Sequence, residues 1–144
     1  MGITTTSDAR LEAALRSGGH RVTSQRLVLY RVLSELGRHA HAEEIARASS
    51  ERLPGLSLPT VYATLELFEG LGLVRRVDAG GPAALYDPRP DPHAHFACRV
   101  CGAVTDLEDG GDPGPAEAAA RATGAEPERV DVVVRGVCAA CRAR

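Results

Sequence analysis

The sequence predicts an α+β protein in which an N-terminal winged helix-turn-helix domain precedes a small C-terminal α/β domain. Within residues 1–86, four segments with helical apolar spacing are followed by two short strand-like segments. Residues 87–92 are rich in proline and interrupt regular structure. Two Cys-x-x-Cys pairs then bracket most of the remaining chain, which indicates a zinc site in the second domain.

The first two expected helices are delimited by capping residues and glycines. Ser7 is the expected N-cap of the first helix, which should end at Gly18. Thr23 is the expected N-cap of the second helix, and Gly37 is its expected stop. The apolar residues expected to face inward in these two helices are Leu11, Ala14, Leu15, Val28, Leu29, Val32, Leu33 and Leu36.

The next two expected helices form the helix-turn-helix. One runs from Ala42 to about Ser50 with Ile45 inward. The other follows the N-cap Ser57, accommodates a proline in its first turn and ends at Gly70. Its expected apolar stripe consists of Val61, Leu65 and Phe68.

Two expected strands, 73–77 and 83–86, flank a Gly/Pro-containing turn and complete the wing. Residues 87–92, Asp-Pro-Arg-Pro-Asp-Pro, should form a stiff hinge. The expected boundaries are therefore a DNA-binding domain, 1–86, the hinge, 87–92, and a second domain, 93–144.

The second domain is expected to be small and to mix strands with one helix. Residues 96–107 and 129–137 have strand-like patterns, and a short helix is expected near 115–122. A domain of under about 60 residues has a marginal core, so a metal staple is a reasonable expectation.

Composition narrows the function classes. A chain of 144 residues is too short for a large enzyme, and 44% hydrophobic with 25% charged residues is ordinary for a globular protein. No apolar run reaches the ~18 to 20 residues of a membrane span, and residues 1–10 lack a signal core, so a cytoplasmic protein is expected. Residues 1–85 carry 10 Arg against 9 acids, whereas residues 86–144 carry 7 against 10. A nucleic-acid surface is therefore expected in the N-terminal part.

The four cysteines suggest a structural zinc ion. Two identically spaced pairs can offer four thiolates to one tetrahedral Zn²⁺, and a reducing compartment favours zinc over disulfides. The 36 residues between the pairs leave room for a folded segment inside the zinc-closed loop. The alternative is that one or both pairs are redox thiols. The expected zinc ligands are Cys98, Cys101, Cys138 and Cys141.

A second group of residues offers nitrogen and oxygen donors without sulfur. Four of the five histidines form two short groups, His39 with His41 and His93 with His95. The last two are one residue apart, so on a strand they would point to the same face. Imidazole with carboxylate suits Fe²⁺ or Mn²⁺. The nearby acids are Asp87 and Asp106. The alternative is a set of solvated polar loop residues.

Several motifs resemble the ferric uptake regulator family. They are His39-Ala-His-Ala-Glu-Glu-Ile45, the helix and turn from Leu58 to Val74, His93-Ala-His-Phe-Ala-Cys-Arg-Val-Cys-Gly102, and Gly136-Val-Cys-Ala-Ala-Cys141. The motifs stand in the family's order, and the resemblance extends from about Leu11 to Cys141.

The resemblance implies a homodimeric repressor that binds a palindromic operator in double-stranded DNA, with the second domain serving for dimerisation. In the peroxide-sensing branch, five residues hold the regulatory Fe²⁺ or Mn²⁺. The matching positions here are His39, Asp87, His93, His95 and Asp106. His41 is the weaker candidate, because His39 keeps the family's offset to Ala42.

The acid at position 106 favours one branch of the family. The iron-uptake branch usually has Glu where this chain has Asp106, and the zinc-uptake branch commonly uses a Cys that this chain lacks. The resemblance therefore implies hydrogen peroxide sensing, in which bound iron leads to oxidation of His39 or His93. An iron- or manganese-uptake regulator is the alternative. A further sensory site of some members is expected to be absent, since Ala94 and Arg129 replace its ligands.

Five residues are candidate DNA contacts. Thr60 and Tyr62 are the candidates to touch bases or thymine methyl groups. Arg21, Gln25 and Arg26 are candidates for phosphate contacts. The family often has Arg or Asn where this chain has Ala63, so a base contact is not expected there.

Two rival functions follow from the same residues. His41-Ala-Glu43 with the first thiol pair matches the ligand pattern of zinc nucleobase deaminases. That reading is weaker, because Ala97 stands where the signature has Pro and the second thiol pair has no role. The other rival is a zinc-stapled DNA-binding module without a sensory site.

Overall fold

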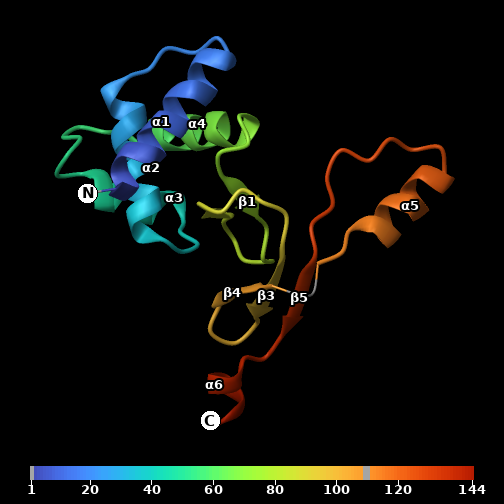
Figure 1. The fold of residues 1–144 in the computed structure, drawn as a ribbon. Helices are drawn as coiled ribbons and strands as arrows, with labels where there is room; N and C mark the ends of the chain where they lie inside the picture. Colours follow the sequence, from blue (N-terminus) through green and yellow to red (C-terminus); the bar gives the residue numbers. More distant parts are fainter. Residues whose placement is uncertain (1, 109–110) are drawn as a thin grey trace. The chain divides into compact units, whose positions relative to one another are not determined.

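The computed structural model describes residues 2–108 and 111–144. They divide into two compact units (Figure 1): an N-terminal unit that extends to residue 78 and includes 83–90, and a C-terminal unit of 79–82 and 91–144. No helix in the described ranges is long and apolar enough to cross a membrane.

The N-terminal unit is a winged helix-turn-helix, as the sequence predicts. Two strands pair antiparallel after four helices, with Val77 opposite Leu85. In chain order the elements are α1 (Gly2–Ser17), α2 (Ser24–Leu36), α3 (Ala42–Ser49), α4 (Leu58–Gly70), β1 (Arg75–Val77) and β2 (Leu85–Asp87).

The predicted caps of α2 and α4 are confirmed. The Thr23 hydroxyl accepts a hydrogen bond from the backbone N–H of Arg26 at 3.3 Å, and Gly37 ends α2 with φ of 58°. The Ser57 hydroxyl accepts from the backbone N–H of Thr60, also at 3.3 Å. These bonds satisfy N–H groups that lack a partner within the helix.

The predicted cap at Ser7 is wrong. α1 begins at Gly2, so Ser7 lies inside the helix, and its hydroxyl oxygen is 3.3 Å from that of Ser34 on α2. No glycine or proline separates Gly2 from Ser7. The helix therefore continues backward, and the serine hydroxyl contacts the neighbouring helix instead of the backbone.

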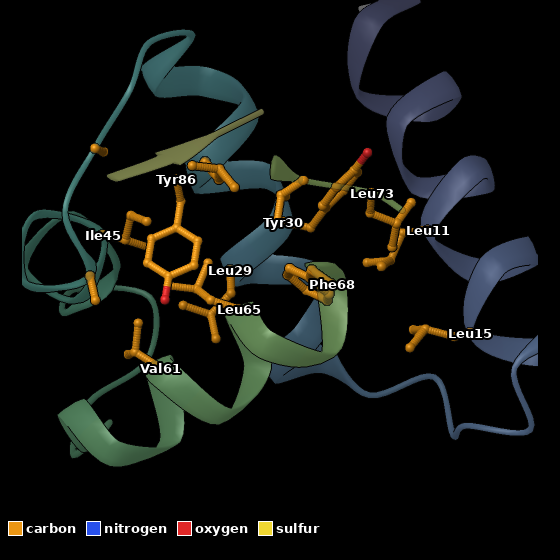
Figure 2. Packing of buried hydrophobic residues seen from close by; sticks show 14 residues of the cluster. Leu11, Leu15, Leu29, Tyr30, Ile45, Val61, Leu65, Phe68, Leu73 and Tyr86 are labelled. Atoms are coloured by element: carbon orange, nitrogen blue, oxygen red, sulfur yellow. The ribbon is translucent and has the colours of Figure 1, made fainter. Parts of the chain in front are cut away.

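The core of this unit lies between α1, α2, α3 and α4 (Figure 2). Tyr30 packs edge-on against Phe68, with ring centroids 5.5 Å apart and an interplanar angle of 80°. The sequence prediction missed Tyr30 and placed Val28 inward, whereas Tyr30 is buried and Val28 is half-buried. The labelled core residues are Leu11, Leu15, Leu29, Tyr30, Ile45, Val61, Leu65, Phe68, Leu73 and Tyr86.

Both strands of the wing are shorter than predicted, and the second strand ends one residue later than predicted. Leu73 and Val74 are buried ahead of β1 and do not pair as strand residues. Asp87 is the last residue of β2, where the sequence placed it first in the hinge. It keeps strand pairing because the first proline follows it at position 88.

The C-terminal unit contains a three-stranded mixed sheet of order β4-β3-β5. β3 runs antiparallel to β4 and parallel to β5. The elements are β3 (Ala94–Cys98), β4 (Val104–Leu107), α5 (Gly114–Ala122), β5 (Val133–Gly136) and α6 (Ala139–Arg142).

The sequence predictions for this unit are confirmed in outline and refined in detail. The strand-like range 96–107 is two strands joined by a turn, in which Gly102 has φ of 74°. The predicted helix near 115–122 is α5. The short helix α6, which carries the last cysteine, was not predicted.

Candidate metal centres and nucleic-acid interface

The four cysteines come together in the C-terminal unit. Each offers a sulfur within 4.8 Å of the other three, and the Cys101 and Cys138 sulfurs are 3.8 Å apart. Four thiolates around Zn²⁺ at about 2.3 Å stand at the corners of a tetrahedron with edges of about 3.8 Å. The observed spacing therefore fits a four-cysteine zinc site, and all four cysteines are free thiols.

Strand pairing positions these sulfurs. β3 and β5 run parallel with Cys98 opposite Gly136, so the backbone leaves the sheet at the same end after each of these two strands. The backbone N–H of Cys138 then donates to the Cys98 sulfur at 3.3 Å. On the other side, the N–H of Gly102 donates to the Cys98 carbonyl at 2.9 Å and closes the turn that carries Cys101.

The thiol acidities differ within the cluster. Backbone N–H groups of Cys101 and Cys138 lower the pKa of Cys98 to about 6. Hydrogen bonding with the Cys138 sulfur, followed by burial, raises the pKa of Cys141 to about 12. Without metal, negative charge therefore concentrates on Cys98, which is the expected first ligand of an incoming dication.

A second donor cluster in the same unit consists of His93, His95 and Asp106. The Asp106 Oδ1 lies 3.1 Å from His93 Nε2 and 3.5 Å from His95 Nε2. The two imidazole rings have centroids 4.4 Å apart. Both histidine side chains are almost fully buried, whereas the Asp106 side chain is 30% exposed.

The hydrogen bond on the far side of His93 fixes its tautomer. His93 Nδ1 lies 2.7 Å from the backbone carbonyl of Asp91 and must donate to it. In the neutral ring Nε2 then carries the lone pair, and this lone pair faces a carboxylate oxygen of Asp106. A cation between the two atoms turns that repulsion into attraction, so the geometry fits a metal ligand set.

In the N-terminal unit, His39 and Asp87 form a separate pair. The His39 Nε2 lies 3.1 Å from Asp87 Oδ2, and the side chains are 11% and 4% exposed. The backbone N–H of Arg89 donates to the other carboxylate oxygen of Asp87 at 2.9 Å.

A single β-bridge creates this pair. Ala40 exchanges both backbone hydrogen bonds with Tyr86, at 3.1 and 2.8 Å, so the neighbours His39 and Asp87 become adjacent. The other histidine of the motif, His41, has its Nδ1 3.1 Å from the Ala84 carbonyl. It is held against the wing and does not join the His39–Asp87 pair.

The candidate DNA residues lie on the N-terminal unit. On α4, Tyr62 is 39% exposed, and the Thr60 hydroxyl is 2.8 Å from that of Ser57. Arg21 and Gln25 are exposed, and the Arg26 guanidinium donates to the Arg21 carbonyl. A connection between Tyr62 and α3 was missed: its hydroxyl donates to Glu43 Oε1 at 3.1 Å.

The sequence analysis also missed the role of Glu44. Its carboxylate accepts from the backbone N–H of His41 at 2.9 Å and pairs with Arg38 at 3.0 Å. These contacts lower the pKa of Glu44, the backbone hydrogen bond most. A carboxylate three residues after a helix N-cap is a known capping signal and could have been found.

A winged helix-turn-helix joined to a unit with a four-cysteine cluster and nitrogen–oxygen donor groups defines the class of metal-dependent transcription regulators. Residues 17–135 match the model of the Ferric uptake regulator family, and the chain belongs to this family. Proteins of the family bind DNA and act as dimers.

Individual relatives include a ferric uptake regulation protein and peroxide-responsive repressors. The chain is 38% identical to ferric uptake regulation protein 1 of Mycolicibacterium fortuitum, over 83% of this chain and 74% of the relative. It is 34% identical to the peroxide-responsive repressor PerR of Staphylococcus epidermidis, over 66% of this chain and 63% of that protein. The Helicobacter pylori ferric uptake regulator structure has the same fold, with a TM-score of 0.74, 20% identity and coverage of 96% and 93%.

Proposed function

We propose that the protein is a dimeric repressor that binds a palindromic operator when Fe²⁺ or Mn²⁺ occupies a regulatory site, and that hydrogen peroxide ends repression by oxidising a ligand histidine. The observation that carries the peroxide-sensing part is the identity of residue 106. An aspartate stands there, with Oδ1 within 3.1 Å of His93 Nε2 and within 3.5 Å of His95 Nε2.

The structural ion is proposed to be Zn²⁺ bound by the four cysteines. Sulfur-only donors at tetrahedral spacing favour zinc. It would tie the C-terminal helix α6 to the end of β3, in a unit whose sheet has only three strands.

The regulatory ion is proposed to take its ligands from both donor groups, His39 with Asp87 and His93 with His95 and Asp106. Each group is largely buried, with Asp106 the most exposed member, and offers nitrogen and oxygen atoms without sulfur, which suits Fe²⁺ or Mn²⁺. An ion bound by both units selects one relative orientation of them. In a dimer this orientation sets the spacing of the two reading helices and therefore the affinity for a palindrome.

Bound Fe²⁺ would activate hydrogen peroxide next to a ligand ring. The O–O bond breaks, one oxygen is added to a ring carbon, the ring gives up two electrons, and the other oxygen leaves as water. The backbone carbonyl of Asp91 holds the His93 ring in one orientation, and the His93 side chain is only 2% exposed. Because the ring is fixed and buried, an oxidant generated beside it would react with the ring before it could escape to solvent. Oxygen added to the ring of His93 or His39 weakens its nitrogen as a ligand, so the ion is lost and the dimer releases DNA.

The DNA contacts are proposed on the N-terminal unit. Tyr62 and Thr60 on α4 would approach base edges in the major groove. Arg21, Gln25 and Arg26, on and before α2, would contact phosphates and fix the position of the helix on the duplex.

A second candidate function is an iron- or manganese-uptake regulator that responds to metal level alone. The observation in its favour is the 38% identity to ferric uptake regulation protein 1, which exceeds the 34% identity to PerR. Both candidates share the zinc site, the regulatory ligands and the DNA-binding unit, and they differ in what peroxide does.

The deciding experiment measures DNA binding to a palindrome of the family type before and after stoichiometric peroxide. The protein is loaded anaerobically with Fe²⁺ or with Mn²⁺, and the histidine peptides are then analysed by mass spectrometry. Release from the Fe²⁺ form alone, with one oxygen atom added to His39 or His93, is expected. Retention in both forms supports the uptake regulator, and release without oxidised histidine overturns the proposed mechanism.

A further inference from the structure

The tyrosine on the exposed face of α4 makes a directional contact with the preceding helix. The Tyr62 hydroxyl donates to Glu43 Oε1 at 3.1 Å. Glu43 lies in the first turn of α3, and Tyr62 lies near the start of α4. Both side chains are exposed, so the contact lies at the surface of the helix-turn-helix.

Glu43 has no competing cation in the described part of the chain. The nearby Arg38 pairs with Glu44, whose carboxylate also accepts from the His41 backbone. No arginine in residues 2–108 or 111–144 comes within ion-pair distance of the Glu43 carboxylate, and its hydrogen-bond partner there is Tyr62. The two adjacent glutamates therefore have different roles, since one caps α3 and the other binds the tyrosine.

This contact fixes the direction of the tyrosine hydroxyl. An ionised carboxylate can only accept, so the phenol proton must point toward Glu43. The lone pairs of the phenol oxygen remain available on its other side. The same hydrogen bond raises the pKa of Tyr62, which keeps the phenol protonated at neutral pH.

We propose that Glu43 makes Tyr62 a hydrogen-bond acceptor toward DNA, so that Tyr62 selects a base with an exocyclic amino group in the major groove. This inference rests on the proposed DNA-binding function of α4. Adenine presents its N6 amino group there and cytosine its N4 amino group, whereas guanine presents two acceptors and thymine presents an acceptor and a methyl group. An acceptor on the protein therefore favours adenine or cytosine and disfavours guanine.

The charge of Glu43 acts in the same direction. A carboxylate beside the reading residue repels phosphates and the acceptor atoms of guanine. It lowers affinity for DNA in general while it increases the difference between sequences. Glu43 is thus a positioning residue for Tyr62, and its removal is expected to weaken discrimination between sequences while it raises the general affinity for DNA.

The test selects bound sequences from random duplexes with metal-loaded, full-length protein. Wild type, Glu43→Ala and Tyr62→Phe are compared, with Glu51→Ala as a control that removes another exposed glutamate. Wild type and the control should prefer adenine or cytosine at one position of each half-site, by about 5- to 10-fold over guanine. In Glu43→Ala and Tyr62→Phe this preference should fall to within about 2-fold at that position alone, with thermal stability unchanged.

A second measurement separates failure of the contact from failure of the proposed function. Spectrophotometric titration without DNA gives the Tyr62 ionisation as the difference between wild type and Tyr62→Phe, and Glu43→Ala should lower its pKa. Identical ionisation in both backgrounds, or an unaltered base preference in Glu43→Ala, overturns the inference. If the titration responds but wild type selects no sequence at all, the DNA-binding proposal fails and the reading role fails with it.

Discussion

His95 on β3 and Asp106 on β4 are direct cross-strand partners, and His95 Nε2 lies 3.5 Å from Asp106 Oδ1. Side chains of directly paired residues lie on the same face of a sheet. A shift of one residue in this register would place Thr105 or Leu107 opposite His95. The strand pairing therefore determines which oxygen donor stands beside the histidines.

Asp106→Ala should abolish tight Mn²⁺ binding and leave the zinc content unchanged. The change removes a carboxylate that faces both His93 and His95, whereas the four cysteines keep their positions. Loss of a ligand should cost at least the roughly 10- to 100-fold typical of supporting residues around a metal. Elemental analysis for both metals after dialysis, with exposed Glu126→Ala as control, checks this; an unchanged Mn²⁺ affinity would contradict the assignment of Asp106.

Asp106→Glu tests the one-methylene difference on which peroxide sensing rests. The longer side chain keeps a carboxylate for the ion but changes its position relative to His93 Nε2. We expect DNA binding with Fe²⁺ to persist and peroxide inactivation to slow by about tenfold or more. Fluorescence anisotropy measures the rate of DNA release after peroxide addition, and this rate is compared between wild type and Asp106→Glu. Equal rates in both proteins would show that residue 106 does not set the sensitivity.

The helices were predictable because their signals are local. Thr23, Gly37 and Ser57 act within a few residues of the helix ends that they define, so the sequence alone reveals them. Ser7 is a serine like the N-cap Ser57, and yet it lies inside α1, with its hydroxyl beside that of Ser34. The competition between a cap and a contact with another helix depends on tertiary packing, which a single sequence does not display.

The clustering of the candidate metal ligands was predictable where it follows from local spacing in the sequence. The thiol pairs and the His93, His95 pair are local patterns, and each group clusters as spacing suggested. The preference for His39 over His41 needed the resemblance, since its structural cause is the bridge between Ala40 and Tyr86. The Glu43–Tyr62 hydrogen bond connects residues 19 positions apart on different helices and leaves no periodic signal in the sequence.

Zinc removal should unfold the C-terminal unit while the N-terminal unit stays folded. Cys98→Ser replaces the thiol that receives the Cys138 N–H and whose pKa is about 6. A structural zinc site contributes several kcal/mol or more to the domain that it closes. Amide hydrogen exchange should show loss of protection in β3 and β5 with α2 and α4 unaffected. Retained protection in the strands would mean that the sheet does not need the metal.

Zinc binding should release fewer than four protons, although four thiols become ligands. At about pH 7.5, Cys98 is already largely ionised in the metal-free protein because backbone N–H groups lower its pKa to about 6. Calorimetry in buffers of different ionisation enthalpy counts the protons. A release of all four at that pH would contradict the ionised state of Cys98.

The capping carboxylate of α3 should make the N-terminal unit less stable in acid. The His41 backbone N–H and then Arg38 lower the pKa of Glu44 from its usual 4.5. A lowered folded-state pKa adds stability that is complete above the unfolded value of 4.5 and is lost as pH falls through the folded value. Glu44→Gln should therefore cost about 1 kcal/mol near pH 7 and progressively less in acid below about pH 4. Because all three tyrosines lie in the N-terminal unit and the protein has no tryptophan, the tyrosine band of the near-ultraviolet circular dichroism reports this unit during urea unfolding. The matched control is Glu51→Gln, which should cost little at either pH, and a Glu44→Gln deficit that persists undiminished in acid would show that the side chain acts through packing and not through its charge.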